Sequence, residues 1–201
     1  MTFGKMPIAN GFLKKKDFKK EYFFNLMPCF CKNCYSFQLF KQPDPKKMFH
    51  KNYAFFSKTS KNMRIHFEDF YKWIKKTYLL KKKTPFVIEI GSNDGILLEN
   101  FAKKGIKHLG IEPSANVAKE SAKNGVNTLV GFFGKNIIKE VLNSYGKADI
   151  VVLANVMCHI PKINEVAKSI SEILNKEGYL IFEDPYLLDV LKKVSYDQIY
   201  D

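Results

Sequence analysis

The sequence lacks several features that mark large classes of proteins. Arg64 is the only arginine, although the formal net charge is +13. No apolar run approaches the roughly 20 residues that a membrane-spanning helix needs. Residues 1–20 contain no continuous apolar segment of the kind found in secretory signals. These absences favour a cytoplasmic protein with no membrane partner.

The shortage of arginine also bears on nucleic acids. Proteins that read bases and phosphates rely heavily on the bidentate guanidinium group. The lysines here are scattered, with short clusters at residues 14–16 and 81–83. The positive charge therefore does not favour a nucleic-acid partner.

The four cysteines do not form a disulfide framework. Cys29, Cys31 and Cys34 lie close together and Cys158 lies far away, in a compartment expected to be reducing. Cys31 and Cys34 have the spacing of a zinc ligand pair, Cys29 is a candidate third ligand, and Cys158 is interpreted as a small buried or loop residue. Zinc needs four ligands, so the sequence predicts a half-site, with residues 1–50 loosely held when no metal is bound.

The chain changes character near residue 85. Before it, the sequence is aromatic, rich in lysine and irregular, apart from a helix predicted over residues 61–80 by helical spacing of apolar residues. After it, short apolar runs at 86–90, 108–111, 128–133, 149–154 and 179–182 alternate with helical stretches at 96–103, 116–123, 136–145 and 163–174. This alternation predicts an α/β fold with a mostly parallel, doubly wound sheet.

A glycine turn follows the first of these strands. Gly91 and Gly95 enclose Ser92, Asn93 and Asp94 between a buried strand and a helix. Glycine lets the backbone approach a ligand closely, and ligands bind at the carboxyl ends of such strands. Glu112 ends the second strand about 20 residues later, the offset expected for an acid that accepts both hydroxyls of a ribose. The pattern predicts a nucleoside site.

The turn departs from the dinucleotide fingerprint G-x-G-x-x-G, because its two glycines are four residues apart. Polar side chains stand where a pyrophosphate cradle would be. S-adenosylmethionine has no phosphate, so the departure favours it over NAD. The residues expected to bind this cofactor are Glu89, Gly91, Ser92, Asn93, Asp94, Gly95, Glu112, Pro113, Ser114, Phe132, Phe133 and Asn155.

Some of these residues have a structural alternative. Asp94 is a candidate for the amino-acid end of the cofactor or for a helix N-cap. Phe132 and Phe133 could flank the adenine or pack in the core.

These motifs resemble those of the sugar C-methyltransferases, which use S-adenosylmethionine to methylate a ring carbon of nucleotide-linked (dTDP) deoxy-ketosugars. The matching stretches are residues 6–12, 31–34 with 38–39, 53–57 with 60, 89–97, 154–156 with 159–161, 183–186 and 196–201. General methyltransferases share only the region of Gly91 and Glu112.

The resemblance implies an N-terminal zinc module with two C-x-x-C pairs, a Rossmann-like cofactor domain and a second α/β domain. Cys31 and Cys34 would be the second zinc pair, and His159, Tyr200 and Tyr53 would face the sugar. The first pair would precede residues 7–10, and a histidine base would follow Tyr200 and Asp201. The chain is therefore expected to be truncated at both ends.

The expected parts are a remnant of a zinc-binding, substrate-side module at 1–60, a linking helix at 61–84, the S-adenosylmethionine-binding methyltransferase domain at 85–194 and the start of a further domain at 195–201. Oligomeric state is left open.

Carbon methylation needs a base, a donor near the enolate oxygen and in-line placement of the methyl group. His159 could be the donor or the base; its structural alternative is a loop histidine beside Pro161. Two other functions stay open: an RNA methyltransferase, whose RNA affinity would depend on salt, and a cofactor-binding fragment without turnover.

Overall fold

The computed structural model describes residues 1–195 and 199. The chain divides into two compact units, one formed by Met1–Ala54 with Pro185–Asp201 and the other by Phe55–Asp184. Among the described residues, no helix is long and apolar enough to cross a membrane.

The unit of Met1–Ala54 and Pro185–Asp201 contains two small antiparallel hairpins. Strand β1 (Lys5–Pro7) pairs with β2 (Phe23–Asn25), and β3 (Pro28–Phe30) pairs with β4 (Phe37–Leu39). The short helices are η1 (Lys15–Lys20), α1 (Pro45–Met48) and α7 (Leu187–Lys193). Strands of three residues bury few side chains, which agrees with an irregular module that depends on more than its own core.

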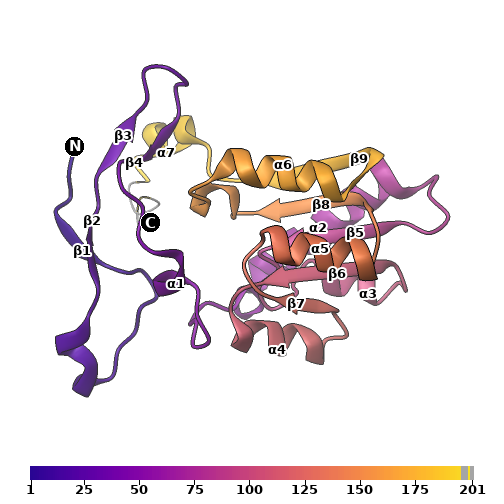
Figure 1. Ribbon diagram of the computed structural model, residues 1–201, viewed down its shortest axis with the longest axis horizontal. Helices are drawn as coiled ribbons and strands as arrows, with labels where there is room; N and C mark the ends of the chain where they lie inside the picture. The colour runs from indigo at the N-terminus through magenta and orange to yellow at the C-terminus, as the bar shows by residue number, and fades with distance from the viewer. Residues whose placement is uncertain (196–198, 200–201) are drawn as a thin grey trace. The chain divides into compact units, whose positions relative to one another are not determined.

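The unit Phe55–Asp184 is built on a five-stranded parallel sheet. Its strands are β5 (Phe86–Ile90), β6 (Lys107–Glu112), β7 (Thr128–Val130), β8 (Ala148–Ala154) and β9 (Leu174–Glu183), in the spatial order β7-β6-β5-β8-β9 (Figure 1). The helices are η2 (Ser57–Thr59), α2 (Lys61–Ile74), η3 (Lys75–Leu79), α3 (Leu98–Ala102), α4 (Ala115–Lys123), α5 (Lys135–Ser144), η4 (Met157–His159) and α6 (Ile163–Ile173). The α/β class and the doubly wound parallel sheet are confirmed.

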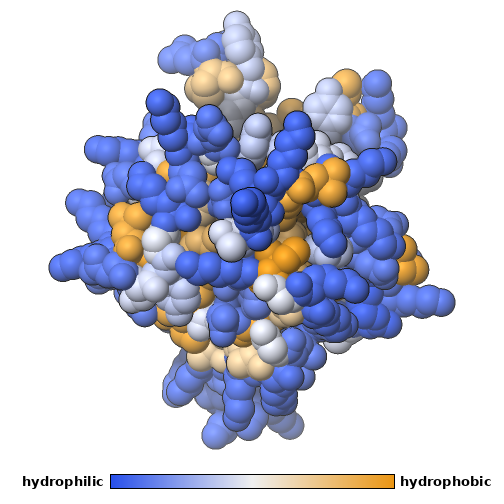
Figure 2. Space-filling model, turned by 90° about the vertical axis from the view of Figure 1, so that its right-hand side faces the viewer, coloured by the Kyte–Doolittle hydropathy of each residue, from blue (hydrophilic) through white to orange (hydrophobic). Residues whose placement is uncertain are grey.

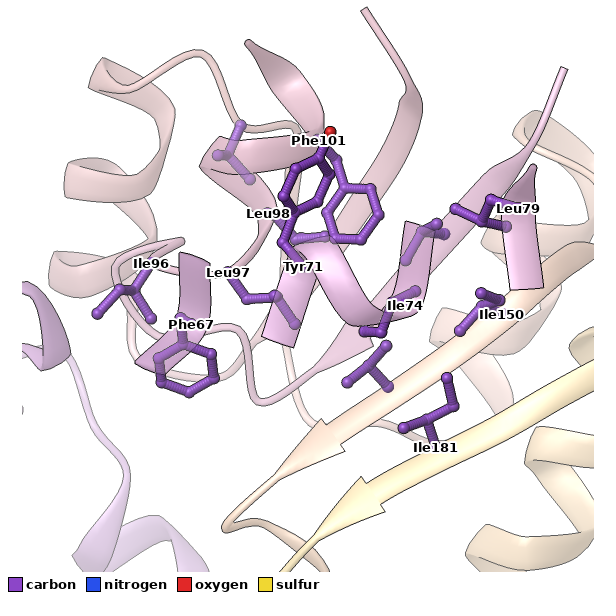
Figure 3. Packing of buried hydrophobic residues seen from close by; sticks show 13 residues of the cluster. Phe67, Tyr71, Ile74, Leu79, Ile96, Leu97, Leu98, Phe101, Ile150 and Ile181 are labelled. Carbon is purple, nitrogen blue, oxygen red and sulfur yellow. The ribbon is translucent and has the colours of Figure 1, made fainter. Parts of the chain in front are cut away.

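Both faces of the central strands are buried because their side chains alternate between two cores. Val87 of β5 joins a cluster with α2 and α3, whereas Ile88 joins a cluster with α5 and α6. Ile150 and Val151 of β8 alternate in the same way. Figure 3 shows the first cluster, in which the Tyr71 ring meets the Phe101 ring edge-on at 4.8 Å.

Helix α2 belongs to this unit and does more than link two parts. Its Phe67, Tyr71 and Ile74 are buried against the sheet, and Ser60 caps its N-terminus by accepting a hydrogen bond from the Met63 N–H. The helix widens into the π-helical stretch η3 before the chain enters β5. A division of the chain at residue 54 therefore follows the packing better than the expected divisions at residues 60 and 84.

The surface agrees with the scattered lysines of the sequence. The face shown in Figure 2 is mostly hydrophilic, and its apolar residues stand in small separate groups. Single exposed apolar residues are normal for folded proteins.

Candidate functional site

The glycine turn lies where the strand order of the sheet reverses. From β5 the chain continues to β6 and β7 on one side, and β8 and β9 lie on the other. Gly91 follows β5 with a left-handed φ of +72°, and a Cβ atom there would lie 2.5 Å from Cγ2 of Val156, just beyond β8. Ligands of open α/β sheets bind at this kind of switch point. Glycine at residue 91 is thus required both by its dihedral angle and by the close approach of Val156.

Glu112 ties the turn to the end of β6. One carboxylate oxygen accepts a hydrogen bond from the Asn93 N–H at 3.0 Å and the other accepts one from the Ser114 N–H at 2.8 Å. The side chain is buried. Glu112 therefore lies at the ligand edge, as expected from its offset, and also fixes the backbone of the turn.

Three buried carboxyl groups surround the turn. Burial raises the pKa of Glu89 well above its usual range, and the charges of Asp94 and Glu112 raise it further. Burial also raises the pKa of Asp94 and of Glu112, although backbone N–H donors oppose the effect at both. One carboxyl oxygen of Glu89 and one of Asp94 have no hydrogen-bond partner in the described residues. The turn therefore offers unpartnered carboxyl oxygens to a ligand.

Asn93 and Asp94 hold the segment that leads into α2. The Asn93 side chain accepts from the Ser57 N–H and donates to the Phe55 carbonyl, and Asp94 accepts from the Lys58 N–H at 2.9 Å. The N-cap alternative for Asp94 does not hold, because the N-cap residue of α3 is Leu97. The second carboxyl oxygen of Asp94 has no hydrogen-bond partner among the described residues.

The other expected cofactor residues lie at the same edge or beside it. Ser92 is buried in the turn and Pro113 is partly buried after β6. After β7, Phe133 packs against the core, whereas the side chain of Phe132 is 43% exposed. Phe132 is therefore the ring available to a ligand. Phe133 packs in the core, which is the alternative that the sequence left open for it.

Near the ends of β8 and β9, the side chains of His66, Asn155 and Glu183 form a second polar group. Asn155 has a left-handed φ of +56°, and its backbone N–H donates to the Glu183 carbonyl at 2.6 Å. The Glu183 carboxylate contacts His66 Nε2 at 2.9 Å and accepts a longer bond of 3.4 Å from the Asn155 side chain. The neighbouring Asp184 accepts from the Cys158 N–H, which ties η4 and its His159 to the end of β9.

His66 was missed by sequence reasoning. It lies on α2, far from Glu183 in the sequence, and nothing local distinguishes it from other helical histidines. The run of acidic residues at 183–184 was the only available signal, and it does not name a partner.

The three residues expected to face a sugar lie in different parts of the chain, and their common role stays a prediction. His159 lies in η4, in the unit of the glycine turn. Tyr53 belongs to the other unit. Tyr200 lies outside the described residues.

Cys31 and Cys34 lie in the turn between β3 and β4. The backbone N–H groups of Cys34 and Asn33 and the Cys34 side chain lower the pKa of the Cys31 thiol. Cys29 lies in β3, opposite Gln38 of β4. The described part of the chain contains no group of three or more potential metal ligands, so the structure does not bring Cys29 to Cys31 and Cys34 as a third ligand. Cys31 and Cys34 alone supply two of the four ligands that tetrahedral zinc needs.

The strand order and the glycine turn define a domain of the Rossmann-like class, with buried carboxyl groups at its switch point. A family model described as "Methyltransferase domain" matches residues 63–200, more than half of the chain, so this chain belongs to the methyltransferase-domain family. A second model, "Putative zinc binding domain", matches residues 1–49. The resemblance noted in the sequence is thereby confirmed at the level of S-adenosylmethionine-dependent methyltransferases.

Individual relatives agree with this assignment. The C-methyltransferase NovU of Streptomyces niveus is 28% identical over all 201 residues, which span 47% of NovU, so the chain covers about half the length of this curated relative. The PH0226 protein from Pyrococcus horikoshii OT3 superposes with a TM-score of 0.55 at 17% identity, over 70% of this chain and 66% of that one. The plantazolicin methyltransferase BpumL, in complex with SAH, gives a TM-score of 0.53 at 17% identity, over 69% and 53%. These two structures show the shared fold.

Gly91→Ala is expected to destabilise the protein more than Gly105→Ala does. Both residues have positive φ, which costs a side chain about 1–2 kcal/mol, but only at Gly91 would the new Cβ overlap a neighbour. The overlap adds about 1–3 kcal/mol. Urea denaturation of the two variants measures the difference, and equal free energies of unfolding would show that Val156 does not confine the turn.

Glu89→Gln is expected to change how stability depends on pH. Because the pKa of Glu89 is raised in the folded state, wild-type stability falls as pH rises from the unfolded value near 4.5 towards the raised pKa. The slope reaches about 1.4 kcal/mol per pH unit while only the unfolded state is ionised. Glu89→Gln removes this contribution, whereas Glu140→Gln, at an exposed residue, retains it. The free energy of unfolding of the three proteins is measured by urea denaturation at several pH values. The same pH dependence in all three proteins would contradict the prediction.

Proposed function

We propose that the chain binds S-adenosylmethionine over the glycine turn and belongs to a methyltransferase that acts on a ring carbon of a nucleotide-linked deoxy-ketosugar. The observation that carries the cofactor assignment is the set of buried carboxyl groups at the switch point, with two unpartnered oxygens. S-adenosylmethionine carries a sulfonium, an ammonium and two ribose hydroxyls, and it has no phosphate. Acceptors and negative charge suit each of these groups.

Different residues are proposed to bind different parts of the cofactor. Glu112 lies at the end of β6 with both oxygens near the turn, so it is placed to accept the ribose hydroxyls. Asp94, with its unpartnered oxygen, suits the ammonium, and Phe132 suits the adenine. When bound, the cofactor supplies an electrophilic methyl group.

The acceptor assignment depends on the similarity to NovU, described as a C-methyltransferase, over the whole of this chain. A carbon acceptor must lose a proton, and a neighbouring ketone makes that possible because the charge rests on the enolate oxygen. His159 and Asn155 follow β8, on the opposite side of β5 from Glu112. This placement supports an acceptor over β8 and β9.

We also propose that Cys31 and Cys34 form a zinc ligand pair. Both lie in residues 1–49, the part of the chain that matches the zinc-binding family model. Zinc binds the thiolate form of cysteine. The lowered pKa of Cys31 and the N–H donors of its turn favour that form. The zinc is structural in this proposal and takes no part in methyl transfer.

The function is tested by calorimetry with S-adenosylmethionine and by mass spectrometry of dTDP-4-keto-6-deoxyglucose incubated with protein and cofactor. We expect binding, and a product heavier by one methylene group. Glu112→Gln should weaken binding about tenfold to a hundredfold, the range for hydrogen bonds to charged groups, while the exposed Glu172→Gln leaves it unchanged. No binding by the wild-type protein would overturn the proposal; binding without product would favour the cofactor-binding alternative.

The zinc proposal is tested by measuring metal content with plasma mass spectrometry. Wild-type protein should retain zinc, and Cys31→Ser and Cys34→Ser should each lose most of it because each removes one of the few available ligands. Cys158→Ser, which lies in the other unit, serves as the matched control and should keep the metal. A metal-free wild-type protein would contradict the assignment.

A further inference from the structure

Helices α2 and α3, with the stretch η3 that continues α2, border an open groove of about 440 Å³. The chain enters β5 soon after Leu80 of this groove and enters β6 soon after Lys104. The groove therefore lies near the amino ends of these two strands. The glycine turn and Glu112 lie at their carboxyl ends, so the groove is separate from the ligand edge.

The lining of the groove is rich in lysine. Lys72 is paired with Glu68 at 2.8 Å, and Lys103 is paired with Glu99. Three further lysines of the lining have no ion-pair partner among the described residues: Lys75, Lys76 and Lys104. Charges of one sign that gather in a cleft attract ions of the opposite sign. The groove therefore favours an anion.

The Tyr71 side chain adds a hydrogen-bond donor to the wall of this groove. Tyr71 is only 6% exposed, and its ring packs edge-on against Phe101. Its hydroxyl group has no hydrogen-bond partner among the described residues. Figure 3 shows this hydroxyl on the side of the cluster away from Ile150 and Ile181. A buried hydroxyl without a partner costs free energy, and an acceptor oxygen that reached it from the groove would remove that cost.

We infer that this groove is a second binding site of the chain and that it takes a small phosphorylated molecule. A phosphate group carries close to two negative charges at neutral pH, which suits several unpaired lysines, and its oxygens can accept the Tyr71 hydrogen bond. Leu80 and the methylene stems of the lysines offer apolar surface to the organic part of the ligand. The volume lies in the range of small-molecule sites.

Calorimetry with inorganic pyrophosphate tests the site at about 0.15 M salt, where long-range attraction between exposed charges is largely screened. The wild-type chain should bind pyrophosphate. A double variant, Lys75→Gln with Lys76→Gln, should bind it about tenfold or more weakly, because two unpaired charges are lost. The matched control, Lys135→Gln with Lys139→Gln, removes the same charge from α5, which packs on the other face of the sheet, and should bind like wild type.

Tyr71→Phe separates binding from folding. Because the hydroxyl has no partner, its removal should leave the free energy of unfolding in urea unchanged or raise it. Pyrophosphate binding should weaken about threefold to tenfold, the usual contribution of one hydrogen bond. A Tyr71→Phe variant that unfolds more easily and binds pyrophosphate as wild type does would show that the hydroxyl serves the fold and no ligand.

Three results would overturn the inference. The first is no binding of pyrophosphate by the wild-type chain. The second is an equal loss of binding in the groove variant and in the α5 control, which would show unspecific attraction to a chain of net charge +13. The third is binding of a single-stranded RNA oligonucleotide without binding of pyrophosphate, which would make the groove part of a nucleic-acid surface.

Discussion

The close approach of Val156 to Gly91 is the constraint on which the ligand edge depends. Without a Cβ at Gly91, the chain leaving β8 can lie against the turn that leaves β5, so the two halves of the sheet meet at the switch point. A side chain there would push Val156 away, and with it the neighbouring Asn155 that is bonded to Glu183. The side expected to bind the cofactor and the side proposed for the acceptor are therefore coupled through one pair of residues.

The second constraint on this edge is the free-energy cost of its buried carboxyl groups. The chain carries a net charge of +13, yet the turn gathers Glu89, Asp94 and Glu112, all buried. Burying carboxyl groups costs free energy unless they are protonated, bonded or paired. Glu112 is satisfied by two backbone donors, and Asp94 by one. The oxygens left over at Glu89 and Asp94 form an acceptor set that a cationic ligand without phosphate would complete.

Most of the fold was predictable, because alternating apolar runs and helical stretches are local signals. The strand over residues 86–90 was predicted to the residue. The misses lie where tertiary packing decides: β7 ends at Val130, before the phenylalanines, and β9 begins at Leu174, well before its apolar run, since pairing with β8 extends it. At the site, Gly91 and Glu112 were predictable from spacing. His66 was not, because its partner lies on the far strand of the sheet.

The contacts of α2 explain why this helix belongs to the unit Phe55–Asp184, which contains the glycine turn. Asn93 and Asp94 hold the segment before the helix, Ser60 caps it, and Phe67 and Ile74 bury its inner face. These contacts fix the helix along its length, so a histidine one turn in from the N-terminus reaches the carboxyl end of β9 in a defined orientation. A helix that only linked two domains could not position an imidazole in this way. The same turn that is expected to bind the methyl donor thus helps to fix the helix that carries His66.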